Sequence, residues 1–493
     1  MLLLGIDLGT SSIKVSIVDS TNGKLVASAQ YPEVESPISS PQAGWAEQDP
    51  EMWWKNTQMA IEKAVQSKSF DPYRIAAIGI SYQMHGLVIV DKNNKVLRPS
   101  IIWCDSRAVI IGQKAFDTIG HEQCLSHLLN SPGNFTASKL AWVKENEPEV
   151  YEKIDKIMLP GDYLALRLTN DLSCSNSSLS EGIFWDFQTN TLSEDILKNY
   201  GFSKTIFPEI RPVFSEHGQL NAVIAGNLGL RAGIPITYKA GDQPNNALSL
   251  NVLEPGEVAA TAGTSGVVYA VTDKVAYDPQ SRVNTFAHVN HRMKKAEDRL
   301  GILLCVNGTG ILNRWLKDNL GNGLSYSQMN GLASESPIGS NGLTVLPFGN
   351  GAERIFNNQT LGAKFSKIDF NIHSQKDIFR ASQEGIAFSL KYGMDIMSET
   401  GNAPKIIRAG KANMFLSSVF AETIVNASQV PVELYDTDGS KGAALGAGIG
   451  LGIFANPKDA FVHMEKLAVI EPNILQKAAY EEAYENWKKE LGV

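Results

Sequence analysis

A short polar turn near the start of the chain carries residue types suited to binding phosphate. The turn separates two apolar segments and contains Asp7, Gly9, Thr10, Ser11 and Lys14. Gly9 lets the backbone turn sharply and approach a ligand closely. The hydroxyls of Thr10 and Ser11, with nearby backbone N–H groups, suit phosphate oxygens, and Asp7 is an acid placed to meet a divalent cation. The sequence therefore predicts a nucleotide site at this turn.

A second turn in the other half of the chain repeats the pattern. In the segment VAATAGTSGVVYAV at 258–271, Gly263-Thr264-Ser265 aligns with Gly9-Thr10-Ser11. Thr261 occupies the place of Asp7 in this second copy, so only the first copy supplies the acid. Two such turns, one in each half, predict a duplicated fold that holds phosphates from both sides.

Two further groups of polar residues follow predicted strands. A predicted buried strand at 75–81 is followed by Met84 and His85. Ligands bind at the ends of strands in open α/β sheets. His85 either hydrogen-bonds a ligand hydroxyl or is a satisfied core histidine. After a strand at 101–103 that ends in Trp103, Asp105 and Arg107 either line a pocket or pair with each other at a helix start.

Asp242 is the candidate for proton transfer. It follows a short apolar strand at 234–238 and precedes the second turn, near the junction of the two halves. A carboxylate there is suited to accept the proton of a hydroxyl that attacks a phosphate. The alternative is that Asp242 is the N-cap of a helix that starts at Gln243, because Asp is a favoured cap.

A glycine at a strand-to-helix turn in the second half extends the candidate nucleotide site. Gly410 follows a strand at 404–409. A glycine at such a turn lets a flat base lie against the backbone, and Asn413 can bond to adenine or ribose. The glycine-rich run at 439–449 lacks the order of a P-loop and indicates a closely packed helix instead.

Local patterns predict the elements that must position these residues. Predicted strands lie at 2–6, 13–18, 24–31, 75–81, 87–90, 101–103, 234–238, 256–271 (as a hairpin), 300–306, 343–347, 404–409 and 432–435, the last being the final strand. Predicted helices lie at 50–67, 137–145, 193–199, 310–320, 375–399, 410–426, 439–449 and 474–491, and 156–169 is expected to mix strand and turn. The polar segment 173–180 is expected to cover a ligand cleft.

Length and composition limit the classes of function. A chain of 493 residues exceeds one core, so two domains of about 250 residues or three smaller ones are expected. A net charge of −8 without a basic block excludes a nucleic-acid partner, and no apolar run reaches the roughly 20 residues of a membrane span. The four cysteines are far apart and are expected to be free thiols. A cytoplasmic location is the default expectation.

Six motifs follow one another between residues 5 and 266. They are GIDLGTSSIK, GWAEQDPEMWW, GISYQMHGLVIVD, WCDSR, GDQPNNA and GTSG. With these motifs the chain resembles the FGGY family of carbohydrate kinases, within the actin, hexokinase and Hsp70 superfamily, and is most similar to its xylulokinase members. The resemblance implies an α/β fold of two duplicated ribonuclease H-like (actin-like ATPase) domains with a cleft between them. It places a sugar-binding domain at 1–240 and a nucleotide-binding domain at 241–493.

The resemblance also implies an activity and its residues. It implies ATP-dependent phosphorylation of D-xylulose to D-xylulose 5-phosphate, with ATP, Mg²⁺ and a small ketose bound and a homodimer left open. Asp242 would be the general base and Asp7 the metal ligand. The ketose would meet Met84, His85, Trp103, Asp105 and Gln243. The nucleotide would meet Thr10, Ser11, Lys14, Gly263, Thr264, Gly310, Gly410 and Asn413.

Three departures from the family pattern leave the substrate open. Gln243 stands where many xylulokinases have Asn, Arg354 is followed by an unusual Ile-Phe, and Arg408 stands where related kinases have a glycine-rich run. Arg408 would narrow the adenine pocket or shift nucleotide preference. Ribulose, fuculose, gluconate and glycerol are the alternative substrates, although a glycerol kinase would show Arg-Glu at Met84-His85. A nonenzymatic nucleotide-binding member of the superfamily is the alternative of another class.

Overall fold

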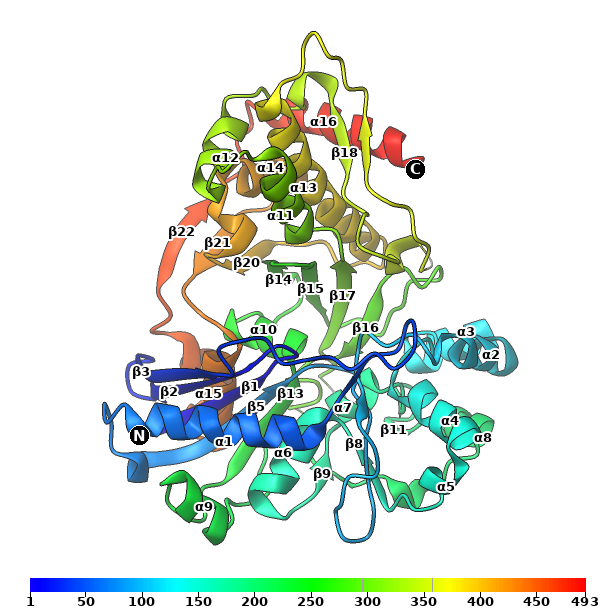
Figure 1. The fold of residues 1–493 in the computed structure, drawn as a ribbon, viewed down its shortest axis with the longest axis vertical. Helices are drawn as coiled ribbons and strands as arrows, with labels where there is room; N and C mark the ends of the chain where they lie inside the picture. Colours follow the sequence, from blue (N-terminus) through cyan, green and yellow to red (C-terminus); the bar gives the residue numbers. More distant parts are fainter. Residues whose placement is uncertain (295–296, 357) are drawn as a thin grey trace.

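The computed structural model describes residues 1–294, 297–356 and 358–493 and shows two lobes, each built around a sheet (Figure 1). The first lobe is the lower one in Figure 1 and the second lobe the upper one. No helix in the described ranges combines the length and the apolar character that crossing a bilayer requires. All four cysteines are free thiols, as predicted.

The sheet of the first lobe has five strands. Its order is β13 (Ile236–Gly241), β5 (Ile75–Tyr82), β1 (Leu2–Leu8), β2 (Ile13–Asp19) and β3 (Leu25–Tyr31). β1 is antiparallel to β2 but parallel to β5, so the Asp7 end of β1 and the Tyr82 end of β5 lie at the same edge. The central strands are buried along nearly their whole length, as expected for apolar strands covered on both faces.

The sheet of the second lobe repeats this pattern with one additional strand at each end. Its order is β16 (Asn284–Ala287), β17 (Leu300–Val306), β15 (Gly266–Thr272), β14 (Glu257–Ala262), β20 (Ile406–Gly410), β21 (Val432–Tyr435) and β22 (Lys466–Ile470). β14 is antiparallel to β15 and parallel to β20, as β1 is to β2 and β5. The duplicated two-domain fold expected from the two polar turns is therefore confirmed.

Helices cover both sheets, and short strand pairs extend the first lobe. The helices are α1 (Pro50–Gln66), α2 (Val109–Ile119), α3 (His121–Leu128), α4 (Thr136–Asn146), α5 (Pro148–Tyr151), α6 (Pro160–Thr169), α7 (Asn176–Glu181), α8 (Glu194–Tyr200), α9 (Ala222–Leu228), α10 (Asp242–Ser249), α11 (Gly310–Leu320), α12 (Tyr326–Ser334), α13 (Gln375–Glu399), α14 (Ser418–Ser428), α15 (Gly439–Gly450) and α16 (Lys477–Leu491). The short pairs are β4 (Glu47–Gln48) with β7 (Ser100–Ile101), β6 (Val88–Val90) with β8 (Lys156–Met158), β9 (Ser173–Cys174) with β12 (Glu209–Ile210), β10 (Trp185–Asp186) with β11 (Thr191–Leu192), and, in the second lobe, β18 (Thr344–Leu346) with β19 (Lys364–Ser366).

Three local expectations were wrong. The segment from Pro160 to Thr169 is a helix, because Pro160 is tolerated in the first helical turn and the Asp162 side chain caps the backbone N–H of Leu159. The helix expected at 410–426 starts only at Ser418, after a 3₁₀ turn at Asn413–Leu416. The strand β21 is not the last, since β22 pairs with its outer edge.

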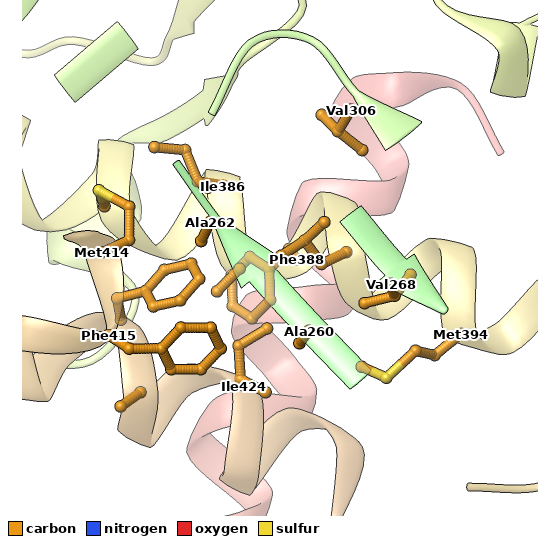
Figure 2. Packing of buried hydrophobic residues seen from close by; sticks show 14 of the residues in the cluster. Ala260, Ala262, Val268, Val306, Ile386, Phe388, Met394, Met414, Phe415 and Ile424 are labelled. Carbon is orange, nitrogen blue, oxygen red and sulfur yellow. The ribbon is translucent and has the colours of Figure 1, made fainter. Parts of the chain in front are cut away.

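The core of the second lobe lies between its sheet and the long helix α13. Figure 2 shows strand residues such as Ala260 and Val268 facing Phe388 and Met394 of α13. The predicted amphipathic helix at 375–399 is confirmed, and its apolar stripe fills this interface. The two strands that flank the turn at 263–265 are therefore both anchored in this core.

The helix α15 leaves the second lobe and packs on the sheet of the first (Figure 1). Ser16 and Ser440 hydroxyls lie 2.7 Å apart, and the Thr237 hydroxyl donates to the Ala447 carbonyl oxygen at 2.7 Å. Glycines let the backbones meet, because a Cβ on Gly5 would collide with the Ser440 carbonyl oxygen. The close packing predicted for 439–449 is confirmed. The domain boundary between 240 and 241 stays a prediction.

Gly5→Ala is expected to lower the free energy of unfolding by about 1–3 kcal/mol or more, because the added methyl group overpacks the α15 contact. The matched control is Gly226→Ala in α9, where a Cβ has open space and alanine favours the helix by roughly 1 kcal/mol. Urea unfolding measures both changes. Equal stabilities of the two variants would contradict the proposed backbone contact.

Candidate active site

Asp242 lies where β13 passes into α10. Gly241 is the N-cap of this helix and Asp242 is its first residue, so the carboxylate is not the cap that one reading of the sequence expected. Backbone and side-chain N–H groups of Gln243 donate to it. Burial raises the pKa of the Asp242 carboxyl to about 7, and the charge of Asp7 adds to the shift. A carboxyl group with this pKa is suited to accept a proton near neutral pH.

Asp7 lies at the end of β1, against the N-terminus of α15. Its carboxylate occupies the space that a Cβ on Gly439 would need. Burial raises the pKa of the Asp7 carboxyl, and the nearby Asp438 adds to the shift. Asp438 is itself paired with Lys14 at 2.6 Å, so the Lys14 ammonium is held at this helix end. The structure thus gathers two carboxylates and one ammonium at the predicted phosphate turn.

The remaining residues of the first turn differ in surroundings. The Thr10 hydroxyl accepts from Trp103 Nε1 at 2.9 Å and donates to Gln83 at 3.2 Å, while Ser11 is exposed. Asp105 and Arg107 pair with each other at 2.7 Å, the structural alternative that the sequence left open. Asp105 also accepts from the Ala46 backbone and is buried. Direct ligand contacts of Trp103 and Asp105 stay predictions.

Met84, which follows β5, lies against the turn that carries Asp242, and His85 is the next residue along the chain. A Cβ on Gly241 would lie 2.6 Å from Met84 Cγ. His85 Nδ1 is 2.9 Å from the Glu181 carbonyl oxygen and must donate to it, so Nε2 is left as an acceptor. Burial lowers the pKa of His85 to about 3, and the positive charge of Lys139 adds a smaller contribution. The ring is therefore neutral. A neutral ring can accept a hydrogen bond from a ligand hydroxyl.

Sequence reasoning missed Glu181, Tyr82 and Lys139, which surround His85. The Tyr82 hydroxyl donates to Glu181 at 2.7 Å, and Lys139 Nζ donates to the His85 carbonyl oxygen at 2.9 Å. The polar segment 173–180 was the only signal near Glu181. It forms β9 and most of α7, and its serines are largely buried.

A cavity of about 560 Å³ in the second lobe brings together most of the nucleotide residues that were predicted in the second half of the chain. Gly263, Thr264, Gly310 and Asn413 line it, and the Gly310 N–H donates to the Gly263 carbonyl oxygen at 2.9 Å. Its wall also includes residues that the sequence did not single out, namely Arg314, Tyr326, Asn330 and Ser417. The volume lies in the range typical of small-molecule sites.

Gly410 and Arg408 are not among the residues that line this cavity. Arg408 pairs instead with Glu257 at 3.2 Å and Glu433 at 3.1 Å on neighbouring strands. Ile407 and Ala409 point into the core of the second lobe, so Arg408 between them faces the other side of the sheet. The expected narrowing of the adenine pocket by Arg408 is therefore absent from the described part of the chain.

Mg²⁺ would find a suitable donor at Asp7. No cluster of three or more His, Cys, Asp or Glu side chains forms a metal site in the described residues. Mg²⁺ does not require such a cage, because one or two carboxylates with phosphate oxygens and water commonly hold it. The carboxylate pair of Asp7 and Asp438 provides that charge next to the phosphate turn.

Comparisons with known proteins agree with this geometry. Residues 2–249 match the N-terminal domain of the FGGY family of carbohydrate kinases, and residues 258–453 match its C-terminal domain. A xylulose kinase of Lactococcus lactis is 32% identical, over 99% of this chain and 96% of the relative. A xylulose kinase of Escherichia coli is 28% identical, over 99% and 98%. The crystal structure of a xyloylose kinase from Brucella ovis is 26% identical, with a TM-score of 0.88, over 100% and 99%. The chain belongs to the FGGY family of carbohydrate kinases.

Proposed function

We propose that this kinase transfers the γ-phosphate of ATP to D-xylulose and forms D-xylulose 5-phosphate. The observation that carries the proposal is Asp242, a buried carboxyl group with a pKa of about 7, on a turn that Glu181 links to the neutral ring of His85. The substrate assignment is supported by the relatives from Lactococcus lactis and Escherichia coli, both xylulose kinases.

In the proposed reaction, the Asp242 carboxylate accepts the proton of the sugar hydroxyl. The hydroxyl oxygen forms a bond to the γ-phosphorus while the bond to the β,γ-bridging oxygen breaks, and ADP leaves. His85 Nε2 accepts a hydrogen bond from a second sugar hydroxyl and orients the ketose, with Met84 and Gln243 beside it. The Gln243 Oε1 atom is buried and has no hydrogen-bond partner among the described residues, which suits it to accept from the sugar.

The nucleotide would span the two lobes. Adenosine would occupy the cavity next to Gly310 and Asn413, with Gly410 nearby. The phosphates would meet Thr264 and Gly263 from the second lobe, and Thr10, Ser11 and Lys14 from the first. Mg²⁺, held at Asp7, would neutralise phosphate charge. Closure of the lobes would exclude water from the transfer. The cytoplasmic location and the homodimer stay predictions.

A sugar panel tests the function. The purified protein is assayed for ADP release with D-xylulose, ribulose, fuculose, gluconate and glycerol, and the phosphorylated product is identified by mass spectrometry. D-Xylulose is expected to give the highest kcat/KM. A higher value with another sugar would transfer the proposal to that sugar. Nucleotide binding without any phosphorylated product would support the nonenzymatic alternative.

The pH dependence of kcat/KM is expected to report Asp242. The ionised carboxylate is the proton acceptor, so kcat/KM should be constant well above pH 7 and fall about tenfold per unit well below it. His85 has a pKa of about 3 and stays neutral over this range, so it does not contribute. Steady-state assays between pH 5.5 and 9 measure the profile, and a flat profile through pH 7 would contradict the role of Asp242.

A further inference from the structure

Glu181 is a buried acid at the sugar side of the site that the proposed reaction does not use. Its side chain is 2% exposed and lies at the end of α7. One carboxyl oxygen accepts from the Tyr82 hydroxyl at 2.7 Å, and the other accepts from the His85 backbone N–H at 3.2 Å. The Glu181 backbone carbonyl accepts from His85 Nδ1. This one residue therefore holds both the backbone and the ring of His85.

The backbone of His85 needs such support. Its φ of 63° lies in the left-handed region, which costs a residue with a side chain about 1–3 kcal/mol and persists only where surrounding contacts hold it. On the other side of the residue, Lys139 and Thr136 donate to the His85 carbonyl oxygen at 2.9 Å and 3.2 Å. Glu181 holds the other end of the residue, because its carboxyl group accepts a hydrogen bond from the His85 backbone N–H.

The same carboxyl group touches the turn that carries Asp242. Both Glu181 carboxyl oxygens lie 3.3 Å from the place of a Cβ on Gly241, the residue before Asp242. Glu181 thus lies between the loop of His85 and the turn of Asp242, in contact with both. A shift of this carboxyl group would change the distance between the acceptor nitrogen of His85 and the carboxylate of Asp242.

We propose that Glu181 is a positioning residue that sets the separation of His85 Nε2 and the Asp242 carboxylate, and thereby decides which sugar hydroxyl meets the base. This inference rests on the proposed function. In the described part of the chain, the Glu181 carboxyl group accepts from the Tyr82 hydroxyl and the His85 backbone N–H, and the His85 ring next to it is neutral. Its size and hydrogen-bonding shape therefore matter more than its charge.

The charged and titratable surroundings agree with this view. Tyr82 of β5, Asp162 of α6 and Asp242 of α10 face Glu181, as do Lys139 of α4 and Tyr269 of β15. Burial raises the pKa of Glu181 well above its ordinary value, and the negative charges of Asp242 and Asp162 add to the shift. An uncharged amide of the same shape should therefore be tolerated.

Two substitutions separate shape from charge. Glu181→Gln keeps the length of the side chain, its amide oxygen can accept from the His85 backbone N–H, and its NH2 group can donate to the Tyr82 hydroxyl oxygen, so kcat/KM for the ketose should stay within about threefold of wild type. Glu181→Asp keeps the carboxyl group but withdraws it by one methylene, and a misplacement of this size should lower kcat/KM about 100-fold. The dissociation constant of ATP should change less than about twofold in both variants, because Glu181 does not line the cavity of the second lobe.

A matched control shows whether loss of a buried glutamate alone matters. Glu384 in the second lobe is also buried and accepts from Gly339, Ser340 and Arg380. Glu384→Asp should lower the unfolding midpoint and leave kcat/KM for the ketose within about twofold.

The outcomes separate the inference from the proposed function. Greater activity in Glu181→Gln than in Glu181→Asp supports positioning by shape. Equal activities, or greater activity in Glu181→Asp, would overturn it. If the wild-type protein phosphorylates no sugar of the panel, the proposed function fails on that result alone. An active wild type combined with the wrong order of the two variants removes only the role of Glu181.

Discussion

Asp242→Asn is expected to lower kcat about 10³-fold, because a general base contributes roughly 10²–10⁴ to a proton transfer of this kind. Asparagine keeps the size of the side chain and can keep contacts with Gln243, so the turn between β13 and α10 should persist. ATP binding should change little, since the cavity in the second lobe does not include Asp242. The residual activity of this variant should no longer decrease below pH 7.

The measurement combines single-turnover ADP release with calorimetric titration of ATP. Asp278→Asn is the control, because Asp278 is a buried carboxylate paired with Arg282 at 3.0 Å in the second lobe. That variant should lose stability and keep kcat. Turnover of Asp242→Asn within about tenfold of wild type would remove the proposed base, because that loss is smaller than proton transfer supplies.

Asp7→Asn is expected to have the second largest effect, a loss of about 10²–10³ in kcat/KM for ATP, since a bound cation supplies several kcal/mol of charge stabilisation. The amide fits the space against Gly439 but is a weaker ligand for a hard cation. The Mg²⁺ concentration needed for half-maximal activity should rise, while ketose affinity stays the same.

Titration of Mg²⁺ at fixed ATP measures this effect, and ketose binding is followed separately by calorimetry. Lys14→Met provides a comparison, because it removes the partner of Asp438 without touching the carboxylate of Asp7. It should weaken ATP binding but leave the Mg²⁺ requirement unchanged. An unaltered Mg²⁺ dependence in Asp7→Asn would place the cation elsewhere.

Local sequence patterns predicted the elements that carry the chemistry. The apolar runs on each side of Gly9 and Gly263 are typical of strands, and both form hairpins of the expected kind. The hydroxyl and carboxyl groups at these turns could be recognised as candidate ligand-binding groups, because the type of a side chain limits the ligands that it can bind. The strand β22 and the helix at Pro160 were missed, since a short edge strand and a proline-initiated helix leave weak local signals.

Contacts between distant segments could not be predicted in the same way. Glu181 meets Tyr82 and His85 only because α7 packs beneath the end of β5, and a single glutamate after a serine-rich run has no pattern that indicates this. The same holds for Arg408, whose side of the sheet depends on strand register. Burial of a charged group depends on the tertiary structure, so the raised pKa of Asp242 could not be predicted from the sequence.

The placement of α15 has a consequence for the biosynthesis of the protein. The sheet of the first lobe is complete in sequence at Gly241, yet one of its faces is covered by a helix that begins at Gly439. A nascent chain must therefore hold an uncovered apolar surface until nearly 200 further residues have left the ribosome. We expect the N-terminal half to stay bound to chaperones throughout this interval and to reach its native state only after the second lobe has emerged.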